Sequence, residues 1–347
     1  RQGGLIGLAA IAIALRSSTK LYLDALLPPV MHCLDDPESR VRYYACESLY
    51  NIAKVGKQDI LTYFNQIFDG LCKLYSDIDM DVKNGSCLLD RLIKEIVSES
   101  ENFDVLSFVP LLQKYIRRTN PYLRKLLVDW IMVLDSVPDI EMIDWLPDFL
   151  DGLFNMLSDG NREIRHAADV ALGGFLRDIR EAAMVDFGPM VSILVRQSGS
   201  KDRANRLAAI TWIQEFITLG GERLILFYSD LLSAVMKCIS DSEIDIQEVA
   251  GKTNQNLLEL VRITTKEFDI APLLRSLTAE LSSNHIPTRI AALHWLNMLL
   301  EKAPGEMGRY IEQLLPALLR TLSDESDDVV MLNLQVLARI ALAPTEF

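Results

Sequence analysis

One hydrophobic pattern recurs along the chain and predicts pairs of amphipathic helices. A polar turn at 36–38 leads into the segment 39–56, where apolar residues recur at three- and four-residue spacing. Positions equivalent to Arg42, which we call register positions, lie 41 residues apart, with a single step of 42. Seven of the nine are basic: Arg1, Arg42, Lys83, Arg124, Arg165, Arg206, Gln247, Arg289 and Val330.

Apolar positions keep the same spacing. Ten residues after each register position stand Ile11, Ile52, Ile93, Leu134, Phe175, Phe216, Leu257, Leu299 and Ile340. A period of this length is typical of HEAT/armadillo repeats, whose helix pairs stack one on the next. We therefore predict an all-α, right-handed α-solenoid that is continuous over 1–347, with about eight helical hairpins of 41 residues and a leading single helix.

The first helix of each pair is expected to end near a polar turn. These helices are predicted at 21–34, 60–75, 105–116, 145–157, 188–195, 228–239, 270–281 and 310–322. Pro28, Pro110 and Pro316 occupy one equivalent site in them, where a proline bends a helix. Asp90 and Asn254 stand where a large apolar residue is expected, and Asn333 stands where a small one is expected.

The turns and the basic register positions together predict a ladder of ion pairs. Six residues before the register positions stand Asp36, Asp77, Asp159, Asp241 and Asp324, with Arg118, Ser200 and Ser283 in the other turns. Stacking would bring the basic residue of one repeat to the turn of the next. We expect this ladder to fix the register between repeats, each exposed pair stabilising by at most about 1 kcal/mol.

Composition excludes several functional classes. Half of the residues are hydrophobic and the net charge is -13, so a basic groove for nucleic acid is not expected, and direct adhesion to an anionic membrane is disfavoured. Five cysteines without a pairing motif fit buried thiols in a reducing compartment: Cys33, Cys46, Cys72, Cys87 and Cys238.

The amino-terminal residues read as part of the same pattern. The apolar stretch 5–15 is too short to span a bilayer, and it falls in register as the second helix of a repeat. Because the chain opens in the middle of a repeat and without Met, we expect it to be a fragment of a longer protein.

The sequence carries no catalytic signature. It lacks the phosphate-binding glycine loops, the H-E-x-x-H zinc motif and the G-x-S-x-G nucleophile motif. The four histidines, His32, His166, His285 and His294, are scattered and lack metal-ligand spacing. We therefore expect no enzyme activity, no metal site and no cofactor.

Two stretches are candidates for binding a partner. Between Lys125 and Arg162 there are eight acids and no basic residue, and Trp130 and Trp145 lie among them. This segment is either a solvated connection between repeats or a partner site with aromatic anchors, for which Trp130, Asp144, Trp145 and Asp148 are the candidates.

The second stretch combines basic and aromatic residues with glycines. Its candidates are Arg40, Arg42, Tyr43 and Tyr44, beside the glycine-rich start with Gly3, Gly4 and Gly7. Each glycine weakens a helix by about 1 kcal/mol relative to Ala, so the run predicts very close approach by a neighbouring helix or a partner.

The most specific signal is a resemblance that runs along the whole chain. It rests on the segments 1–10, 39–55, 68–71, 88–92, 107–112, 137–140, 149–154 and 321–329. In these segments the chain resembles the vacuole-morphology scaffold of the phosphatidylinositol-3-phosphate 5-kinase (PIKfyve-type) complex.

The resemblance implies an amino-terminal portion of a non-catalytic subunit. That subunit holds together a lipid kinase and an opposing Sac-type phosphoinositide phosphatase, is cytosolic and lies peripherally on endosomal and vacuolar or lysosomal membranes, its membrane association being indirect. Residues 1–97 resemble the segment associated with the kinase. Self-association and phosphatase binding would fall to a carboxy-terminal part that this sequence lacks. Relatives can carry a long polar insertion at the equivalent of 261–268. The repeat spacing is nearly constant there, so either this chain lacks the insertion or its residues are not represented in this sequence.

Two hypotheses about function follow. The leading one is a scaffold that controls phosphatidylinositol 3,5-bisphosphate levels by assembling the kinase with its opposing phosphatase. The alternative is an importin-like transport receptor that binds basic cargo with an acidic inner face.

Overall fold

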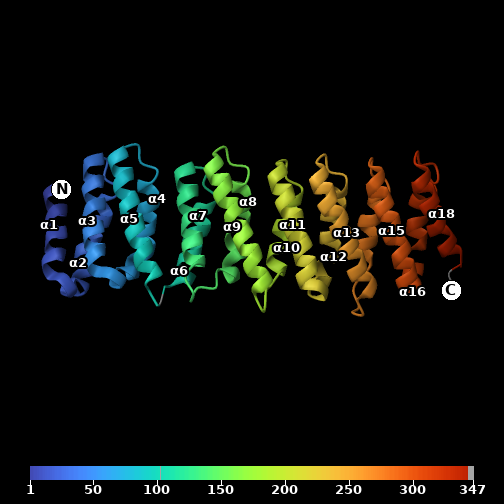
Figure 1. The fold of residues 1–347 in the computed structure, drawn as a ribbon, viewed down its shortest axis with the longest axis horizontal. Coiled ribbons are helices and arrows are strands. Elements are labelled where there is room, and N and C mark those ends of the chain that lie inside the picture. Colours follow the sequence, from blue (N-terminus) through green and yellow to red (C-terminus); the bar gives the residue numbers. More distant parts are fainter. Residues whose placement is uncertain (102, 343–347) are drawn as a thin grey trace. The chain divides into compact units, whose positions relative to one another are not determined.

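The computed structural model describes residues 1–101 and 103–342, and these residues form helices and turns without a strand. The contacts divide the chain into two units, which meet inside one helix: the first runs from Arg1 to Asp178 and the second begins at Ile179. The predicted α-solenoid class is confirmed, because the helices of each unit follow one another in stacked pairs (Figure 1).

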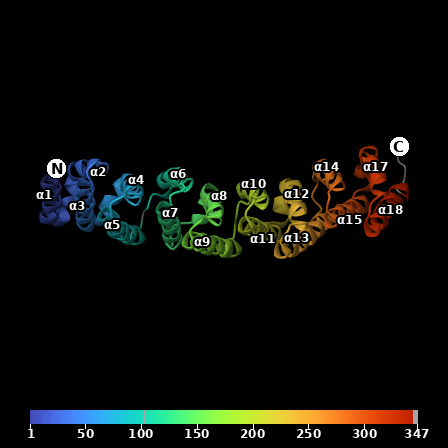
Figure 2. The ribbon, with the colours of Figure 1, turned by 90° about the horizontal axis from the view of Figure 1, so that it is seen from above.

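The first unit opens with a single helix and continues in pairs. The elements are α1 (Gln2–Leu15), η1 (Arg16–Tyr22), α2 (Leu23–Cys33), α3 (Ser39–Gly56), η2 (Lys57–Tyr63), α4 (Phe64–Leu74), α5 (Met80–Ser98), α6 (Val105–Ile116), α7 (Pro121–Asp135), η3 (Met142–Trp145), α8 (Leu146–Met156) and α9 (Arg162–Glu181). The first helices α2, α4, α6 and α8 lie on one side, and α3, α5, α7 and α9 lie on the other (Figure 2).

The second unit repeats this arrangement. Its elements are α10 (Gly188–Ser198), α11 (Arg203–Gly220), η4 (Gly221–Phe227), α12 (Tyr228–Ile239), α13 (Ile244–Ile263), α14 (Ala271–Glu280), α15 (Ile286–Lys302), α16 (Pro304–Gly308), α17 (Ile311–Thr321) and α18 (Asp327–Leu342). The predicted first helices are found to within a few residues. The three marked prolines lie inside α2, α6 and α17.

Several second helices begin at a side chain that caps the free backbone N–H groups. Asp79 accepts from Asp81 N ahead of α5, Asn120 from Tyr122 N ahead of α7, and Asp202 from Ala204 N ahead of α11. Such a cap is worth about 1 kcal/mol, because it satisfies a donor that has no partner within the helix.

The core lies between the two layers of helices in each unit. The recurring apolar position is fully buried, with 0% exposed surface, at Ile52, Ile93, Leu134, Phe175, Phe216, Leu257 and Leu299. At Ile11 in α1 the same position is 51% exposed, because the described chain has no first helix paired with α1.

The predicted ladder is present within both units. Ion pairs join residues 35 apart: Arg1–Asp36, Arg42–Asp77, Arg124–Asp159, Arg206–Asp241 and Arg289–Asp324. The guanidinium of Arg42 forms a fork with Asp77, with Nε to Oδ2 at 2.6 Å and Nη2 to Oδ1 at 2.9 Å. The limit of about 1 kcal/mol for an exposed pair does not apply to this rung, since the side chains of Arg42 and Asp77 are only 15% and 6% exposed.

The arginines of four rungs, all but Arg1, also bind the turn of their own repeat. Arg42 Nη1 donates to the carbonyl oxygen of Asp36 at 2.8 Å, and Arg206 and Arg289 reach the equivalent carbonyls of Ser200 and Ser283. In the turn, Asp77 Oδ1 accepts from the N–H of Asp79 at 2.9 Å. One arginine therefore ties two successive turns together, which fixes the register between repeats.

The three unexpected polar residues of the sequence have partners in the core. Asp90 and Asn254 accept hydrogen bonds from tryptophans of the following repeats, Trp130 and Trp295. Asn333 is fully buried, and its Nδ2 donates to the carbonyl oxygen of Leu318 at 2.7 Å.

Candidate partner-binding surface

A groove between two second helices gathers the aromatic and basic residues of the second candidate stretch. This α3–α5 groove has a volume of about 430 Å³ and is lined by Ser39, Arg40, Tyr43, Tyr44, Asp79, Asp81, Asn84, Gly85 and Leu88. The rings of Tyr43 and Tyr44 meet edge to face at 5.5 Å. Leu88 is 59% exposed beside them. Both tyrosines are half-buried, so the groove presents one exposed aliphatic side chain beside two partly accessible aromatic rings, which are groups that a protein partner would bury.

The two arginines of this candidate stretch have different environments in the structure. Arg40 is exposed and lines the groove. Arg42 is held in the ladder by Asp77, so its guanidinium is not available to a partner. The charge of Glu47, together with burial, raises the pKa of Tyr43 further above neutrality, where a tyrosine hydroxyl is already protonated and can donate a hydrogen bond.

The amino-terminal glycines do not mark close packing within the chain. A Cβ added at Gly3, Gly4 or Gly7 would meet no atom within 4 Å. The interpretation that a neighbouring helix approaches them is therefore wrong for the described chain. Approach by a partner stays a prediction for this face of α1.

Trp130 is not an anchor for a partner, and that prediction is wrong. Its side chain is 0% exposed, and it packs among Phe64, Phe68 and Phe108. The indole N–H donates a hydrogen bond to the carboxylate of Asp90. The prediction that Trp130 anchors a partner came from the acidic residues around it in the sequence. Those residues do not show which face of α7 carries the tryptophan.

The other candidates of the acidic segment do not form one cluster with Trp130. Asp144 is exposed, while Trp145 is half-buried at the start of α8. Asp148 is half-buried and accepts from Gln113 Nε2 at 2.6 Å. Asp159 belongs to the ladder through Arg124. The segment thus mixes structural acids with exposed ones, and a role for Asp144, Trp145 or Asp148 in partner binding stays a prediction.

Two half-buried acids of α7 have raised pKa values. Burial raises the pKa of Asp129, although Lys94 and Lys125 oppose the shift. Burial, with a smaller contribution from the charge of Asp178, raises the pKa of Asp135 to about 6. A raised pKa of a carboxyl makes the folded state bind the proton more tightly than the unfolded chain, so both shifts bear on the pH dependence of stability.

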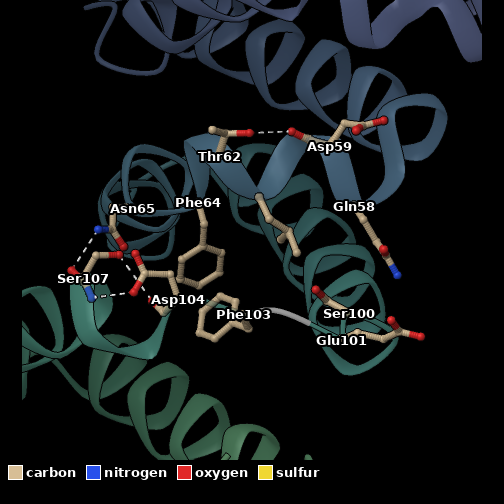
Figure 3. Close-up of a pocket in the computed structure, with 11 residues that line it drawn as sticks. Gln58, Asp59, Thr62, Phe64, Asn65, Ser100, Glu101, Phe103, Asp104 and Ser107 are labelled. Atoms are coloured by element: carbon tan, nitrogen blue, oxygen red, sulfur yellow. Dashed lines mark hydrogen bonds between the residues drawn. The ribbon is translucent and has the colours of Figure 1, made fainter. Parts of the chain in front are cut away.

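A polar cavity of about 540 Å³ was not foreseen from the sequence (Figure 3). Its inner wall is formed by Phe64 and Phe103, whose rings meet edge to face at 4.7 Å. Asn65 Nδ2 donates to the carbonyl oxygen of Ser107 at 2.9 Å, and Asp104 accepts from Ser107 N at 3.1 Å. The lining comes from segments about 40 residues apart that share no motif, so no sequence signal could have found it.

The described residues hold no cluster for binding a metal ion, and two of their cysteines are unreactive. They include no group of three or more histidine, cysteine or acidic side chains that could hold a metal ion. The described cysteines are free, and burial raises the pKa of Cys46 and Cys238 to about 12, so both thiols are protonated and unreactive at neutral pH.

The run Gln2–Cys33 is long and apolar enough to cross a membrane by length and composition. It is not one straight helix, because Arg16 adopts φ 49° and separates α1 from η1. In addition, α1 packs on α3 through Leu5, whose carbonyl oxygen accepts from Ser48 Oγ at 2.9 Å. This run is a helix–turn–helix of the repeat array.

Two family models match the chain. Residues 1–95 match the Vacuolar 14 Fab1-binding region, and residues 174–331 match the EF3 N-terminal HEAT repeat. The first match contains α1 to α4, most of α5, and the whole lining of the α3–α5 groove.

Similar proteins cover the chain over nearly its whole length. It is 49% identical over 347 residues to Protein VAC14 homolog of Arabidopsis thaliana, covering 100% of this chain and 47% of that protein. It is 32% identical over 445 residues to Protein VAC14 homolog of Schizosaccharomyces pombe, covering 98% of this chain and 55% of that protein. The chain thus spans about half the length of these relatives.

A solved structure of Kap95p bound to RanGDP is also similar. It is 11% identical, covers 99% of this chain and 44% of that one, and has a TM-score of 0.41. A likeness at this level carries no argument about function.

Proposed function

The chain belongs to the family of VAC14 homologues, and from this membership we propose that it is a non-catalytic scaffold for a phosphatidylinositol-3-phosphate 5-kinase. The observation that carries the proposal is the match of residues 1–95 to a Fab1-binding region. The α3–α5 groove supports it, because within that stretch it offers the exposed Leu88 beside the half-buried rings of Tyr43 and Tyr44.

The scaffold acts by tethering. Two proteins bound to one repeat array react as if at millimolar concentration, so a weak encounter becomes a frequent one. We propose that the second tethered protein is the Sac-type phosphatase that opposes the kinase. The complex would then make and remove phosphatidylinositol 3,5-bisphosphate at one place on the endosomal or vacuolar membrane. Membrane association is proposed to be indirect, through the partners.

The importin-like alternative has less support. The similarity to VAC14 homologues spans the whole chain at 49% identity, whereas the similarity to Kap95p is 11%. Tight binding of a basic localisation peptide would favour the transport receptor, and co-purification with the lipid kinase would count against it.

Capture of the kinase by the purified chain tests the proposal. The whole chain is immobilised, and the lipid kinase lacking its catalytic domain is passed over it, with an unrelated HEAT-repeat protein as the control. Retention of the kinase by this chain and not by the control is the expected result. No retention by the folded chain would contradict the proposal that this half of the scaffold binds the kinase.

A further inference from the structure

The ladder of ion pairs is interrupted at one position by two basic residues. Lys83 in α5 is a register position, and the residue 35 further along is Arg118, in the turn between α6 and α7. At the five complete rungs that second position holds an aspartate. Two cations therefore stand where the five complete rungs have a cation and a carboxylate.

The backbone around Arg118 has the same geometry as the other turns. The N–H of Arg118 donates to the carbonyl oxygen of Tyr115 at 2.9 Å, as the N–H of Asp77 does to that of Leu74 at 3.1 Å. Arg124 Nε donates to the carbonyl oxygen of Arg118 at 3.0 Å, as Arg42 does to its own turn. The backbone of this turn therefore follows that of a complete rung, while the side chain at position 118 is a cation in place of the anion.

The two cations have no acidic partner among the described ion pairs. Lys83 Nζ lies over the ring of Tyr122, 4.2 Å from its centroid, and Tyr122 is 54% exposed. Arg118 is exposed and lines a cavity of about 550 Å³ whose other charged lining residues are Asp69, Lys73 and Lys114. Those two lysines are already paired with Asp69, which leaves Arg118 as the cation available there.

We propose that the unfilled rung at Lys83 and Arg118 receives an acidic side chain of the kinase partner. The inference rests on the proposed function and names the chemistry of one contact in it. A carboxylate is favoured because carboxylates fill the same position in the five complete rungs. The net charge of -13 would weaken the approach of an anionic lipid surface more than that of one acidic loop.

The site also continues the α3–α5 groove, since α5 contributes Asn84, Gly85 and Leu88 to the groove and Lys83 to the unfilled rung. A partner that covers the groove would reach Lys83 on the same helix. Lys83 lies within the stretch that matches the Fab1-binding region, and Arg118 extends the proposed contact past its end.

Arg118→Asp is the decisive variant, because it would complete the rung within the chain. The introduced carboxylate would accept from Lys83 and would compete with the acidic side chain of the partner. The melting temperature of the whole chain should rise, while its affinity for the kinase lacking its catalytic domain should fall at least tenfold. Opposite signs of these two effects exclude misfolding as the cause of lost binding.

Arg117→Asp is the matched control, with the same change of charge at the adjacent exposed residue, which lies outside the ladder position. It should change the affinity less than threefold. Equal losses in both variants would overturn the proposal in favour of a general electrostatic effect. Unchanged binding of Arg118→Asp, with normal capture by the wild type, would overturn it while leaving the proposed function intact.

Binding to lipid vesicles tests whether the two cations bind a phosphate group instead of a carboxylate. Phosphatidylcholine vesicles with 5% phosphatidylinositol 3-phosphate are sedimented with each protein. Sedimentation of the wild type but not of Arg118→Asp, with kinase capture unchanged, would overturn the proposal and assign the cations to a phosphate group. Failure of the wild-type chain to capture the kinase at all would instead refute the proposed function and this inference with it.

Discussion

Trp130 donates its indole N–H to the carboxylate of Asp90 at 2.6 Å, across the contact between one repeat and the next. Trp295 and Asn254 repeat the relationship at 2.8 Å in the second unit. In both cases the acceptor stands seven residues after a register position, Lys83 or Gln247, that takes part in none of the five complete rungs. Successive repeats within the units are therefore joined in two ways, by an arginine–aspartate rung at the turns or by a tryptophan in the core.

Removing the acceptor should destabilise the first unit. Asp90→Ala leaves a fully buried indole N–H without a partner, which costs about 1–3 kcal/mol. It also removes the carboxylate that pairs with Lys94 at 2.7 Å and accepts from the hydroxyl of Tyr75 at 3.2 Å, so the measured loss includes these two contacts. Asp90→Asn keeps an oxygen acceptor and should cost less. Urea denaturation followed by circular dichroism measures both. An Asp90→Ala variant as stable as wild type would show that the hydrogen bond contributes nothing.

The ladder should make a measurable, pH-dependent contribution. Asp77→Asn removes the charge that receives the fork from Arg42, and we expect a loss of about 1.5–3 kcal/mol at pH 7. Asp35→Asn is the control, since Asp35 pairs with Lys73 at a site where both side chains are exposed. That variant should lose less than about 1 kcal/mol.

The pH dependence of this effect follows from the pKa of Asp77. Burial acts to raise it, but the hydrogen bonds from Arg42 and from the N–H of Asp79 outweigh burial, so the pKa is lowered. The stabilisation is therefore present above the unfolded-state pKa of about 4 and is lost as the pH falls through the lower folded-state value. A deficit of Asp77→Asn that stayed constant from pH 7 down to pH 2.5 would contradict this assignment.

Much of the architecture could be predicted from the sequence, because the same pattern of apolar and basic positions recurs in successive repeats. The positions of Ile52 or Phe175 in the core, and the rungs such as Arg42–Asp77, follow from the repeat spacing alone. The burial of Trp130 did not follow, because the acidic composition around it says nothing about which face of α7 it occupies. The partner of Asp90 lies 40 residues away, and only stacked repeats bring the two together.

The candidate surface was less predictable than the fold. Arg40, Tyr43 and Tyr44 do line one groove, but Asp79, Asp81 and Leu88 complete it from α5 and its cap, 35 to 50 residues further along. No local motif marks such a pairing. The cavity beside Phe64 and Phe103 could not be predicted from the sequence either, because its lining also comes from segments without a shared motif.

Two equivalent turns adopt the same positive φ angle with different residues, a lysine in one and a glycine in the other, so the cost of the conformation can be compared within the chain. Lys57 after α3 has φ 48° and ψ -130°, and Gly221 after α11 has φ 50° and ψ -129°. Glycine adopts this conformation without strain. In other residues the same conformation is strained and costs about 1–3 kcal/mol. Lys57→Gly should therefore stabilise the chain and Gly221→Ala should destabilise it, as measured by thermal unfolding. Changes of the same sign in the two variants would contradict this explanation.

Asp135 should destabilise the folded chain at neutral pH. Its pKa of about 6 lies above the unfolded-state value of about 4, so the folded state holds the proton more tightly. Its contribution to stability is complete below pH 4 and is lost as the pH rises through 6. Asp135→Asn mimics the protonated form and should be more stable than wild type at pH 7.5, with a smaller advantage at pH 4.5. An advantage that did not grow with pH would rule out this titration.

The most direct test of the scaffold proposal compares two exposed apolar residues at equivalent positions. Leu88 in the α3–α5 groove is 59% exposed, and Val170 in α9, at the same place in its repeat, is 46% exposed. The affinity of the whole chain for the kinase lacking its catalytic domain is measured for Leu88→Asp and Val170→Asp, with circular dichroism to verify folding. We predict at least a tenfold loss for Leu88→Asp and less than a threefold change for Val170→Asp. Equal affinities of both variants and the wild type would contradict the assignment of kinase binding to this groove.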